Sequence, residues 1–262
     1  METLTFTPSQ AAKISGVSAT LQRDWRRRKI LPPLTEAVAS YTPFEVAQLM
    51  ALNALAEQGL SPLSYRSVAG KLGACIVACA ALSDDAYSGA ESDYLPNSDA
   101  ELDSIIARQA YFPAGMRLGA LEDSISIWRR RRLSQTVAKQ AGYDVAGLEA
   151  FVQFADGSFE FYSSPISAFE AIEYTDPRMT GALIVVSLRS LGREFLDRAG
   201  AFIHVDPDLV ARLSENHGNK VTRQRIEAAR ASAARFDSGA DTEGGQASLD
   251  SADQEQMGGG DV

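Results

Sequence analysis

Cysteine and histidine, the side chains that most often bind zinc or act as nucleophile and general base, are scarce in this sequence. Its 262 residues include only two cysteines and two histidines. Cys75 and Cys79 are four residues apart, so they share one face if their segment is helical. Two thiolates without further Cys or His nearby make an incomplete zinc site. The flanking residues are mostly alanine, valine and isoleucine, which favours cysteines that pack as small buried side chains. Metal or redox sensing is the alternative.

The two histidines, His204 and His217, lie far apart and belong to no motif. His204 precedes Asp206 and Asp208, and an imidazole next to a carboxylate can act as an acid–base pair. A structural or surface histidine is the favoured interpretation. We find no phosphate-cradling glycine loop, nucleophile elbow or metal triad in the sequence. We therefore expect no catalytic residue, no metal and no cofactor, and a protein that is not an enzyme.

Basic side chains are the remaining chemical groups of interest, and they are unevenly distributed. The chain has a formal net charge of −9. Residues 1–82 nevertheless carry +3, whereas residues 83–127 and 236–262 each carry −7. A basic head combined with acidic segments is compatible with nucleic-acid binding. A second basic run, Arg129–Arg132, is best explained as a plain solvated face, with a phosphate- or partner-binding surface as the alternative.

The first basic run belongs to a predicted helix over residues 19–29. Thr7 and Pro8 are expected to start a preceding helix, and Gly16 supplies the turn between the two. Leu21 and Trp25 are four residues apart and define the expected inward face of the second helix. Its outward face carries small side chains at the start and basic side chains further along, which suits the major groove of DNA. The residues expected to contact DNA are Ser18, Ala19, Thr20, Arg23, Arg26, Arg27, Arg28 and Lys29.

The order of these elements resembles the MerR family of winged helix-turn-helix regulators. The resemblance covers about residues 5–72 and is carried by FTPSQAAKISGVS, TLQRDWRRRKILPP and SYTPFEVAQLMALNALAEQGLS. It implies that the second helix reads DNA, that a two-stranded wing follows Ile30–Pro33, and that Tyr41 precedes the third helix. Two departures are Asp24-Trp25 in place of the family's tyrosine pair, and a wing over residues 34–40 that lacks arginine.

The remaining sequence predicts an α+β fold. We expect helices over 43–58 and 61–82, a hairpin turning at Asp156-Gly157, a buried strand over 182–188, and helices over 190–199 and 219–236. The predicted organisation is a winged helix-turn-helix domain (1–82), an acidic linker (83–104), a smaller α+β domain (105–236) and a disordered acidic tail (237–262). The α+β domain is a candidate effector or dimerisation domain.

Aromatic residues are concentrated in the predicted hairpin. Core packing is their favoured role, and the lining of a ligand pocket is the alternative. These residues are Phe151, Phe154, Phe159, Phe161 and Tyr162.

The predicted function is sequence-specific binding of double-stranded DNA in transcriptional control, in a bacterial cytoplasm. No signal peptide is recognisable, and no run reaches the roughly 18 apolar residues of a membrane helix. Regulators of this kind usually bind as homodimers, because one helix buries too little surface for specific affinity. RNA polymerase or an effector are further candidate partners. The alternatives are a protein-interaction protein that keeps the fold and a phage excisionase-like architectural protein.

Overall fold

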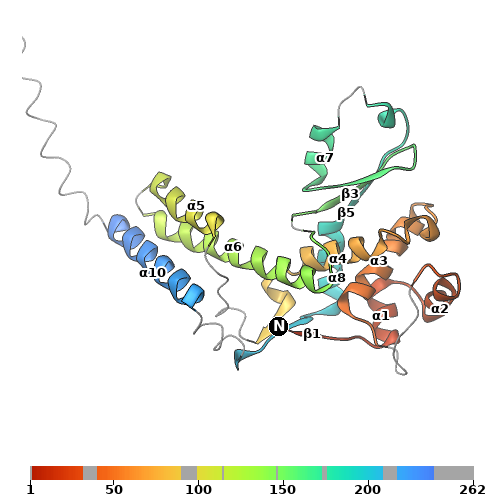
Figure 1. The fold of residues 1–262 in the computed structure, drawn as a ribbon, viewed down its shortest axis with the longest axis horizontal. Helices are drawn as coiled ribbons and strands as arrows, with labels where there is room; N and C mark the ends of the chain where they lie inside the picture. Colours follow the sequence, from red (N-terminus) through yellow and green to blue (C-terminus); the bar gives the residue numbers. More distant parts are fainter. Residues whose placement is uncertain are drawn as a thin grey trace, which may run out of the picture. The chain divides into compact units, whose positions relative to one another are not determined.

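The computed structural model describes residues 2–31, 40–89, 99–113, 115–145, 147–172, 176–208 and 217–238. These residues form an α+β structure, as the sequence predicts, and the strands make two three-stranded sheets. The chain divides into two compact units, each built from two separate stretches (Figure 1). The first unit comprises residues 1–94 and 130–212, and the second comprises residues 95–129 and 213–262.

Helices from both stretches of chain build the first unit. Their bounds are α1 (Pro8–Ser15), α2 (Ala19–Arg27), α3 (Pro43–Glu57), the 3₁₀ turn η1 (Pro62–Tyr65), α4 (Ala69–Ala80), the 3₁₀ turn η2 (Asp84–Ala86) and α8 (Leu188–Ala199). α3 packs against α4, and α4 packs against α8 (Figure 1). Gly192 of α8 allows this approach, because a Cβ there would lie 2.8 Å from the carbonyl oxygen of Ile76. The core of the unit therefore joins segments more than a hundred residues apart.

One small sheet ties the start of the chain to its later part. Its order is β1 (Glu2–Thr3), β6 (Ile203–Val205) and β2 (Tyr87–Gly89), with β1 antiparallel and β2 parallel to β6. The central strand β6 is thus the last of the three to be synthesised.

A second sheet contains the predicted hairpin. Its order is β4 (Phe159–Tyr162), β3 (Ala150–Gln153) and β5 (Ile184–Ser187), all antiparallel. The turn forms at Asp156-Gly157 as predicted, with Gly157 at φ 89°. On one face, Phe151 packs edge-on against Phe161 and against Tyr65 of η1. On the other face lies α7 (Pro165–Ala171), whose Ala168 shares a cluster with Phe154. Phe151 and Phe154 are therefore core residues.

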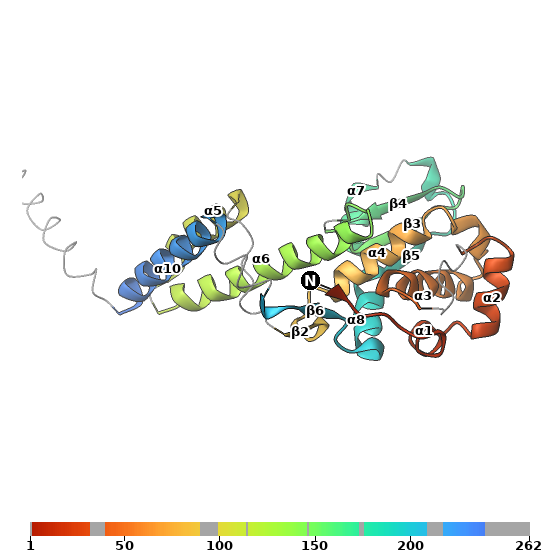
Figure 2. The same cartoon turned by 60° about the horizontal axis from the view of Figure 1, so that its bottom comes forward.

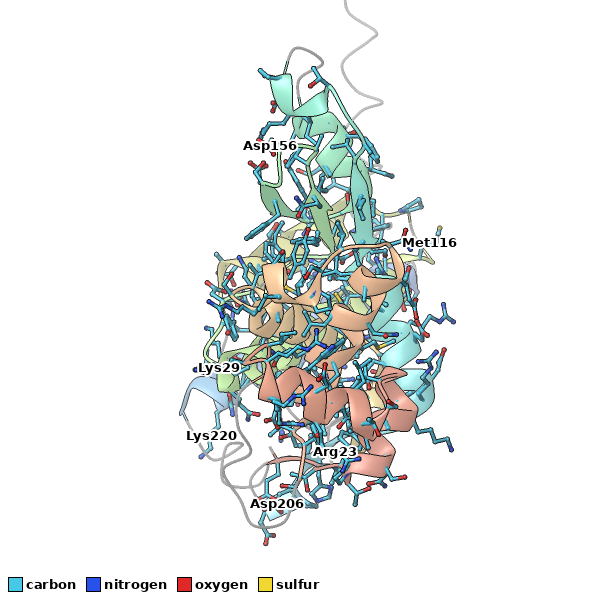
Figure 3. All side chains as sticks on the ribbon, turned by 90° about the vertical axis from the view of Figure 1, so that its right-hand side faces the viewer. Arg23, Lys29, Met116, Asp156, Asp206 and Lys220 are labelled. Carbon is cyan, nitrogen blue, oxygen red and sulfur yellow. The ribbon has the colours of Figure 1, made fainter. Side chains whose placement is uncertain are left out.

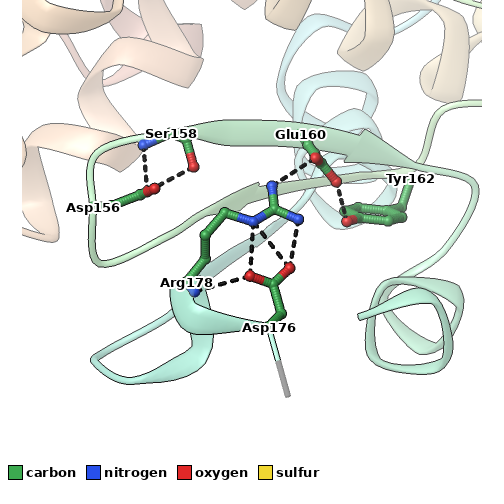
Figure 4. A network of polar contacts seen from close by, with 6 residues as sticks. All are labelled: Asp156, Ser158, Glu160, Tyr162, Asp176 and Arg178. Carbon is green, nitrogen blue, oxygen red and sulfur yellow. Dashed lines mark hydrogen bonds and ion pairs between the residues drawn. The ribbon is translucent and has the colours of Figure 1, made fainter. Parts of the chain in front are cut away.

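A polar network fixes the turn η5 (Pro177–Met179) to β4 (Figure 4). Arg178 donates to Asp176 at 2.7 Å and to Glu160 at 2.7 Å, and its guanidinium lies 4.2 Å from the ring centre of Phe154. Tyr162 donates to Glu160, and burial together with this bond raises the pKa of Tyr162 to about 12. Every group in the network has a partner, so we assign it a structural role.

The second unit is helical. It contains α5 (Ala100–Arg108), the 3₁₀ turn η4 (Gln109–Tyr111), the first half of α6 (Arg117–Gln140), and α10 (His217–Asp237). α5 and α10 lie along α6 (Figures 1 and 2) and share an apolar cluster centred on Trp128, which is fully buried. The carboxylate of Asp237 accepts backbone N–H bonds from Gly115 at 2.7 Å and Leu118 at 3.0 Å. The end of α10 thereby caps the start of α6.

The observed units differ from the predicted domain boundaries. β2 and the start of α5 lie within the predicted linker, residues 83–104. The predicted α+β domain, residues 105–236, is shared between both units because α6 passes from one to the other. Asp237 belongs to α10, so the predicted tail begins too early. Residues 239–262 of that tail, and the predicted wing apart from Ser40, lie outside the described residues. Among the helices described, none is long and apolar enough to cross a membrane.

Candidate nucleic-acid interface

α1 is closed at both ends by signals that the sequence contains. Thr7 accepts from the backbone N–H of Gln10, and the Gln10 side chain accepts in return from Thr7, which completes a capping box. Gly16 ends the helix at φ 77°, a left-handed conformation that glycine adopts without steric cost. A Cβ at Gly16 would lie 3.3 Å from Asn53 of α3. The turn between α1 and α2 is therefore tight and closely packed.

α2 is also delimited by local chemistry. The Ser18 hydroxyl accepts from the backbone N–H of Leu21 at 3.2 Å and caps the first turn. Lys29, just past the helix, has φ 59°, and the N–H of Ile30 then donates back to the carbonyl of Trp25 at 2.8 Å. Ile30 and Leu31 follow as buried residues. The helix is therefore shorter than predicted, and it leads directly into the core.

The buried face of α2 consists of Gln22 and Trp25. Gln22 is 1% exposed and Trp25 is 5% exposed, whereas Leu21 is 37% exposed. The prediction that Leu21 and Trp25 form the inward face is therefore right for Trp25 and wrong for Leu21. The physical reason is that buried hydrogen-bond partners are available to the Gln22 amide, so its burial costs little.

A chain of hydrogen bonds holds α2 in place. Gln22 Nε2 donates to the carbonyl of Val17 at 2.8 Å. The hydroxyl of Tyr41 donates to Gln22 Oε1 at 2.6 Å and accepts from Arg26 at 2.7 Å. Tyr41 in turn forms a two-way backbone bridge with Phe6, 2.8 Å in each direction. The segment before α1, the helix α2 and the start of α3 are thereby connected through one buried tyrosine.

Arg26 is the one predicted contact residue that is not exposed. Its side chain is half-buried, and its guanidinium lies 4.9 Å from the Tyr41 ring centre as well as bonding the Tyr41 hydroxyl. This arginine supports the helix from the inside and is not part of the exposed face. The other predicted contact residues, listed here, are all exposed: Ser18, Ala19, Thr20, Arg23, Arg27, Arg28 and Lys29.

The exposed face of α2 and its C-cap residue present three arginines beside small residues. Arg23 Nε donates to the carbonyl of Ala19 at 3.3 Å and its NH2 group to Thr20 at 3.4 Å, so its side chain lies along the helix surface (Figure 3). Arg27 and Arg28 both pair with Asp24, at 2.5 Å and 2.8 Å. Arginines on a helix of this kind can contact phosphates and the O6 and N7 atoms of guanine.

The two cysteines lie on α4, outside the exposed face of α2, and their thiols are unreactive. Burial raises the pKa of both the Cys75 and the Cys79 thiol to about 12. The thiolate is the reactive and metal-binding form. Within the described ranges, no group of three or more His, Cys, Asp or Glu side chains is placed to hold a metal ion. Both cysteines serve as packing residues of α4.

His204 and the second arginine run have structural contacts. His204 is exposed on β6, and its Nδ1 lies 3.3 Å from the hydroxyl of Ser88 on β2. The side chain of His217 lies outside the described residues. In the second run, Arg130 pairs with Asp84 at 3.4 Å, and Arg132 donates to Gln135 at 2.9 Å. Only Arg131 of this run is exposed, so the run is not a uniformly solvated face.

Comparison with known families agrees with this geometry. Residues 6–63 match the family described as MerR HTH family regulatory protein. The N-terminal segment is therefore a MerR-type helix-turn-helix, which is a DNA-binding module of regulatory proteins. No curated protein and no solved structure matches the chain.

Proposed function

We propose that this protein is a transcription regulator that binds specific sequences of double-stranded DNA by placing α2 in the major groove, and that it acts by binding and not by catalysis. The observation that carries the proposal is the asymmetry of α2. Gln22 and Trp25 face the core, while Arg23 and Arg27 face solvent beside the small residues Ala19 and Thr20. Small side chains at the helix start let the backbone approach the base edges.

The exposed residues divide into two roles in this proposal. Arg23 and Arg27 contact base edges or nearby phosphates from the middle of the face. Arg28 and Lys29 at the helix end, and the Ser18 hydroxyl at its start, contact phosphates and set the orientation of the helix. Asp24 holds Arg27 and Arg28 when DNA is absent, and releases them when phosphates or bases compete for the guanidinium groups.

We further propose that the protein binds as a homodimer in the bacterial cytoplasm, with RNA polymerase or an effector as additional partners. A single recognition helix buries less surface than the roughly 1,000–2,500 Å² of most specific protein–DNA interfaces. Two half-sites about one helical turn apart are the expected arrangement for a two-fold symmetric dimer.

The test is selection of bound duplexes from a random pool by the full chain, followed by titration of the selected duplex. We expect affinity for this duplex at least about a thousandfold above that for a scrambled one. Arg23→Ala or Arg27→Ala should weaken it by about 1–3 kcal/mol if the side chain reads a base. Arg108→Ala on α5 removes one exposed charge outside the interface and is the matched control. Unaltered affinity in the Arg23→Ala/Arg27→Ala double variant, with native circular dichroism, contradicts the proposal.

A second candidate function is an architectural or protein-interaction role on the same fold. It is favoured by one observation, that Asp24 pairs with both Arg27 and Arg28 and lowers the charge of the exposed face. The selection experiment separates the two functions. A DNA-reading protein enriches one motif, an architectural protein binds duplexes without enriching one, and a protein-interaction module retains no duplex.

A further inference from the structure

A cavity of about 500 Å³ lies in the first unit, between the end of α4, α6 and the first half of α8. Its size falls within the roughly 300–1,000 Å³ of small-molecule sites. Three arginines contribute to its lining, Arg130 from α6 and Arg189 and Arg193 from α8. Leu82 and Leu196 supply apolar surface. The cavity is separate from the exposed face of α2.

Two of these arginines, Arg189 and Arg193, are available to a ligand. Arg189 is 70% exposed and keeps only a 3.3 Å pair with Glu149, which does not line the cavity. Arg193 is exposed and has no ion pair among the described residues. The first backbone N–H groups of α8 are already bonded, to Glu149 and Ser187, so the guanidinium groups must do the binding. Two carboxylates, Asp85 and Asp197, also line the cavity and leave a lining charge of +1.

We propose that this cavity binds a small organic anion. Its carboxylate, phosphate or sulfonate group would be held by Arg189 and Arg193, because guanidinium forks form paired, charge-assisted hydrogen bonds with such groups. The apolar part of the ligand packs against Leu82 and Leu196. Asp85 and Asp197 accept bonds from hydroxyl or amino groups of the ligand. Cys79 also lines the cavity, but its protonated thiol makes it a packing surface and not a nucleophile.

The same helix connects the cavity to the helix-turn-helix. Arg198, near the end of α8, donates to the carbonyl of Ile14 in the last turn of α1 at 2.9 Å. Ile14 lies two residues before Gly16, where the chain turns toward α2. α8 also packs against α1, α3 and α4. A ligand that shifts the arginine-bearing half of α8 therefore acts on the end of α1, and binding of the anion alters DNA affinity. This linkage rests on the proposed DNA-binding function, whereas the anion site does not.

Anilinonaphthalene sulfonate is a suitable probe, because it joins an anionic group to an apolar body and fluoresces when bound. We expect saturable binding to the full chain. Arg189→Ala/Arg193→Ala should weaken it about tenfold or more, since a hydrogen bond to a charged group contributes about 1.5–3 kcal/mol. Arg108→Ala should leave it unchanged, and neutral phenylnaphthylamine should not distinguish the variants. If the double variant loses native circular dichroism, Arg193→Gln alone serves in its place.

Competition by citrate or by adenosine monophosphate assigns the favoured anion to carboxylates or phosphates. Equal probe binding by wild type and a folded arginine variant overturns the site.

The linkage is tested by titrating the selected duplex with and without saturating probe. We expect a change in the affinity of wild type, and no change in Arg198→Gln, which should still bind the probe. If the probe leaves the DNA affinity of wild type unchanged, the linkage is overturned. The anion site is then judged by the fluorescence titration alone. If wild type binds no duplex at all, the proposed function fails, and the anion site is still judged by probe binding alone.

Discussion

Tyr41 has a larger structural role than its position in the sequence suggests. Its hydroxyl lies between Gln22 and Arg26, and its backbone bridges to Phe6, so it holds the exposed helix against the rest of the unit. The residue is 2% exposed. A buried hydroxyl with two partners stabilises a structure mainly because its loss leaves those partners unsatisfied.

Replacement of Tyr41 tests this role. Tyr41→Phe keeps the ring and leaves Gln22 Oε1 and the Arg26 guanidinium without the hydroxyl, so we expect a loss of about 1–3 kcal/mol in the free energy of unfolding. DNA affinity should fall as well, because α2 loses its orientation. Urea unfolding and duplex titration measure the two effects. Tyr111→Phe is the control, since Tyr111 is 87% exposed and should tolerate the change. Equal stability of both variants contradicts the assigned role.

The same residues show where sequence reasoning stops. Trp25 was identifiable as a core residue from its size and apolarity. Gln22 was not, because a glutamine is normally placed at the surface and Leu21 offered an apolar alternative one position away. The partner that makes its burial favourable, Tyr41, is 19 residues further along the chain. Only the packed structure brings the two together, and it also turns Arg26 away from the exposed face.

Among the elements, those with local capping signals were predictable. Thr7, Thr42 and Ser18 each cap a helix within one residue of the predicted start, and Gly157 turns the predicted hairpin. α6 was not predicted, because its sequence shows no clear apolar stripe. The reason lies in its environment: its first half packs in the second unit and its second half in the first, so different faces are buried along its length.

The turn between α1 and α2 offers an element-level test. Gly16 and Gly59 both have left-handed backbones, with φ 77° and 80°. A side chain at either position costs about 1–2 kcal/mol in that conformation. A Cβ at Gly16 also meets Asn53 at 3.3 Å, whereas a Cβ at Gly59 meets nothing within 4 Å. Gly16→Ala should therefore destabilise more than Gly59→Ala, as measured by urea unfolding. Equal losses in the free energy of unfolding would show that the Asn53 side chain moves aside without an energetic cost.

For the molecule as a whole, Asp237, the residue at which the tail was predicted to begin, should contribute measurably to stability. Asp237 caps α6, and its hydrogen bonds from the backbone, that of Leu118 foremost, hold the pKa of its carboxyl below the ordinary 3.8. A carboxyl whose pKa is lower in the folded than in the unfolded chain stabilises the fold at any pH above its unfolded-state pKa. This stabilisation is lost as the pH falls through the folded-state pKa.

Two truncations distinguish this cap from the rest of the tail. Removal of residues 239–262 should leave the melting temperature of the second unit nearly unchanged, whereas removal of residues 237–262 should lower it. Asp237→Asn has no carboxyl to protonate at this position. Its stability should therefore fall less than that of wild type as the pH drops below about 4. Thermal melts followed by Trp128 fluorescence, in a Trp25→Phe background, report the effect. Identical melts for both truncations contradict the capping role.

The two tryptophans report on the two units separately. Trp25 is buried in the first unit and Trp128 in the second, and the chain has no other tryptophan. The apolar cluster around Trp128 is much smaller than that around Trp25. We therefore expect Trp128 fluorescence to change at a lower urea concentration than Trp25 fluorescence, measured in the matched Trp25→Phe and Trp128→Phe variants. Coincident midpoints would show that both units unfold as one.

The central position of β6 also constrains the order of events during synthesis. β1 and β2 lie within the first 89 residues, yet both pair with a strand at residues 203–205, and α4 packs on a helix that begins at Leu188. At about 5–20 residues per second, the ribosome needs on the order of 6–23 s to add the intervening residues. Throughout that interval the helix-turn-helix has α3 and α4 but lacks α8 and β6, and the face of α4 that packs on α8 is exposed to chaperones. The first unit, which contains the helix-turn-helix, is therefore complete only after most of the chain has been made.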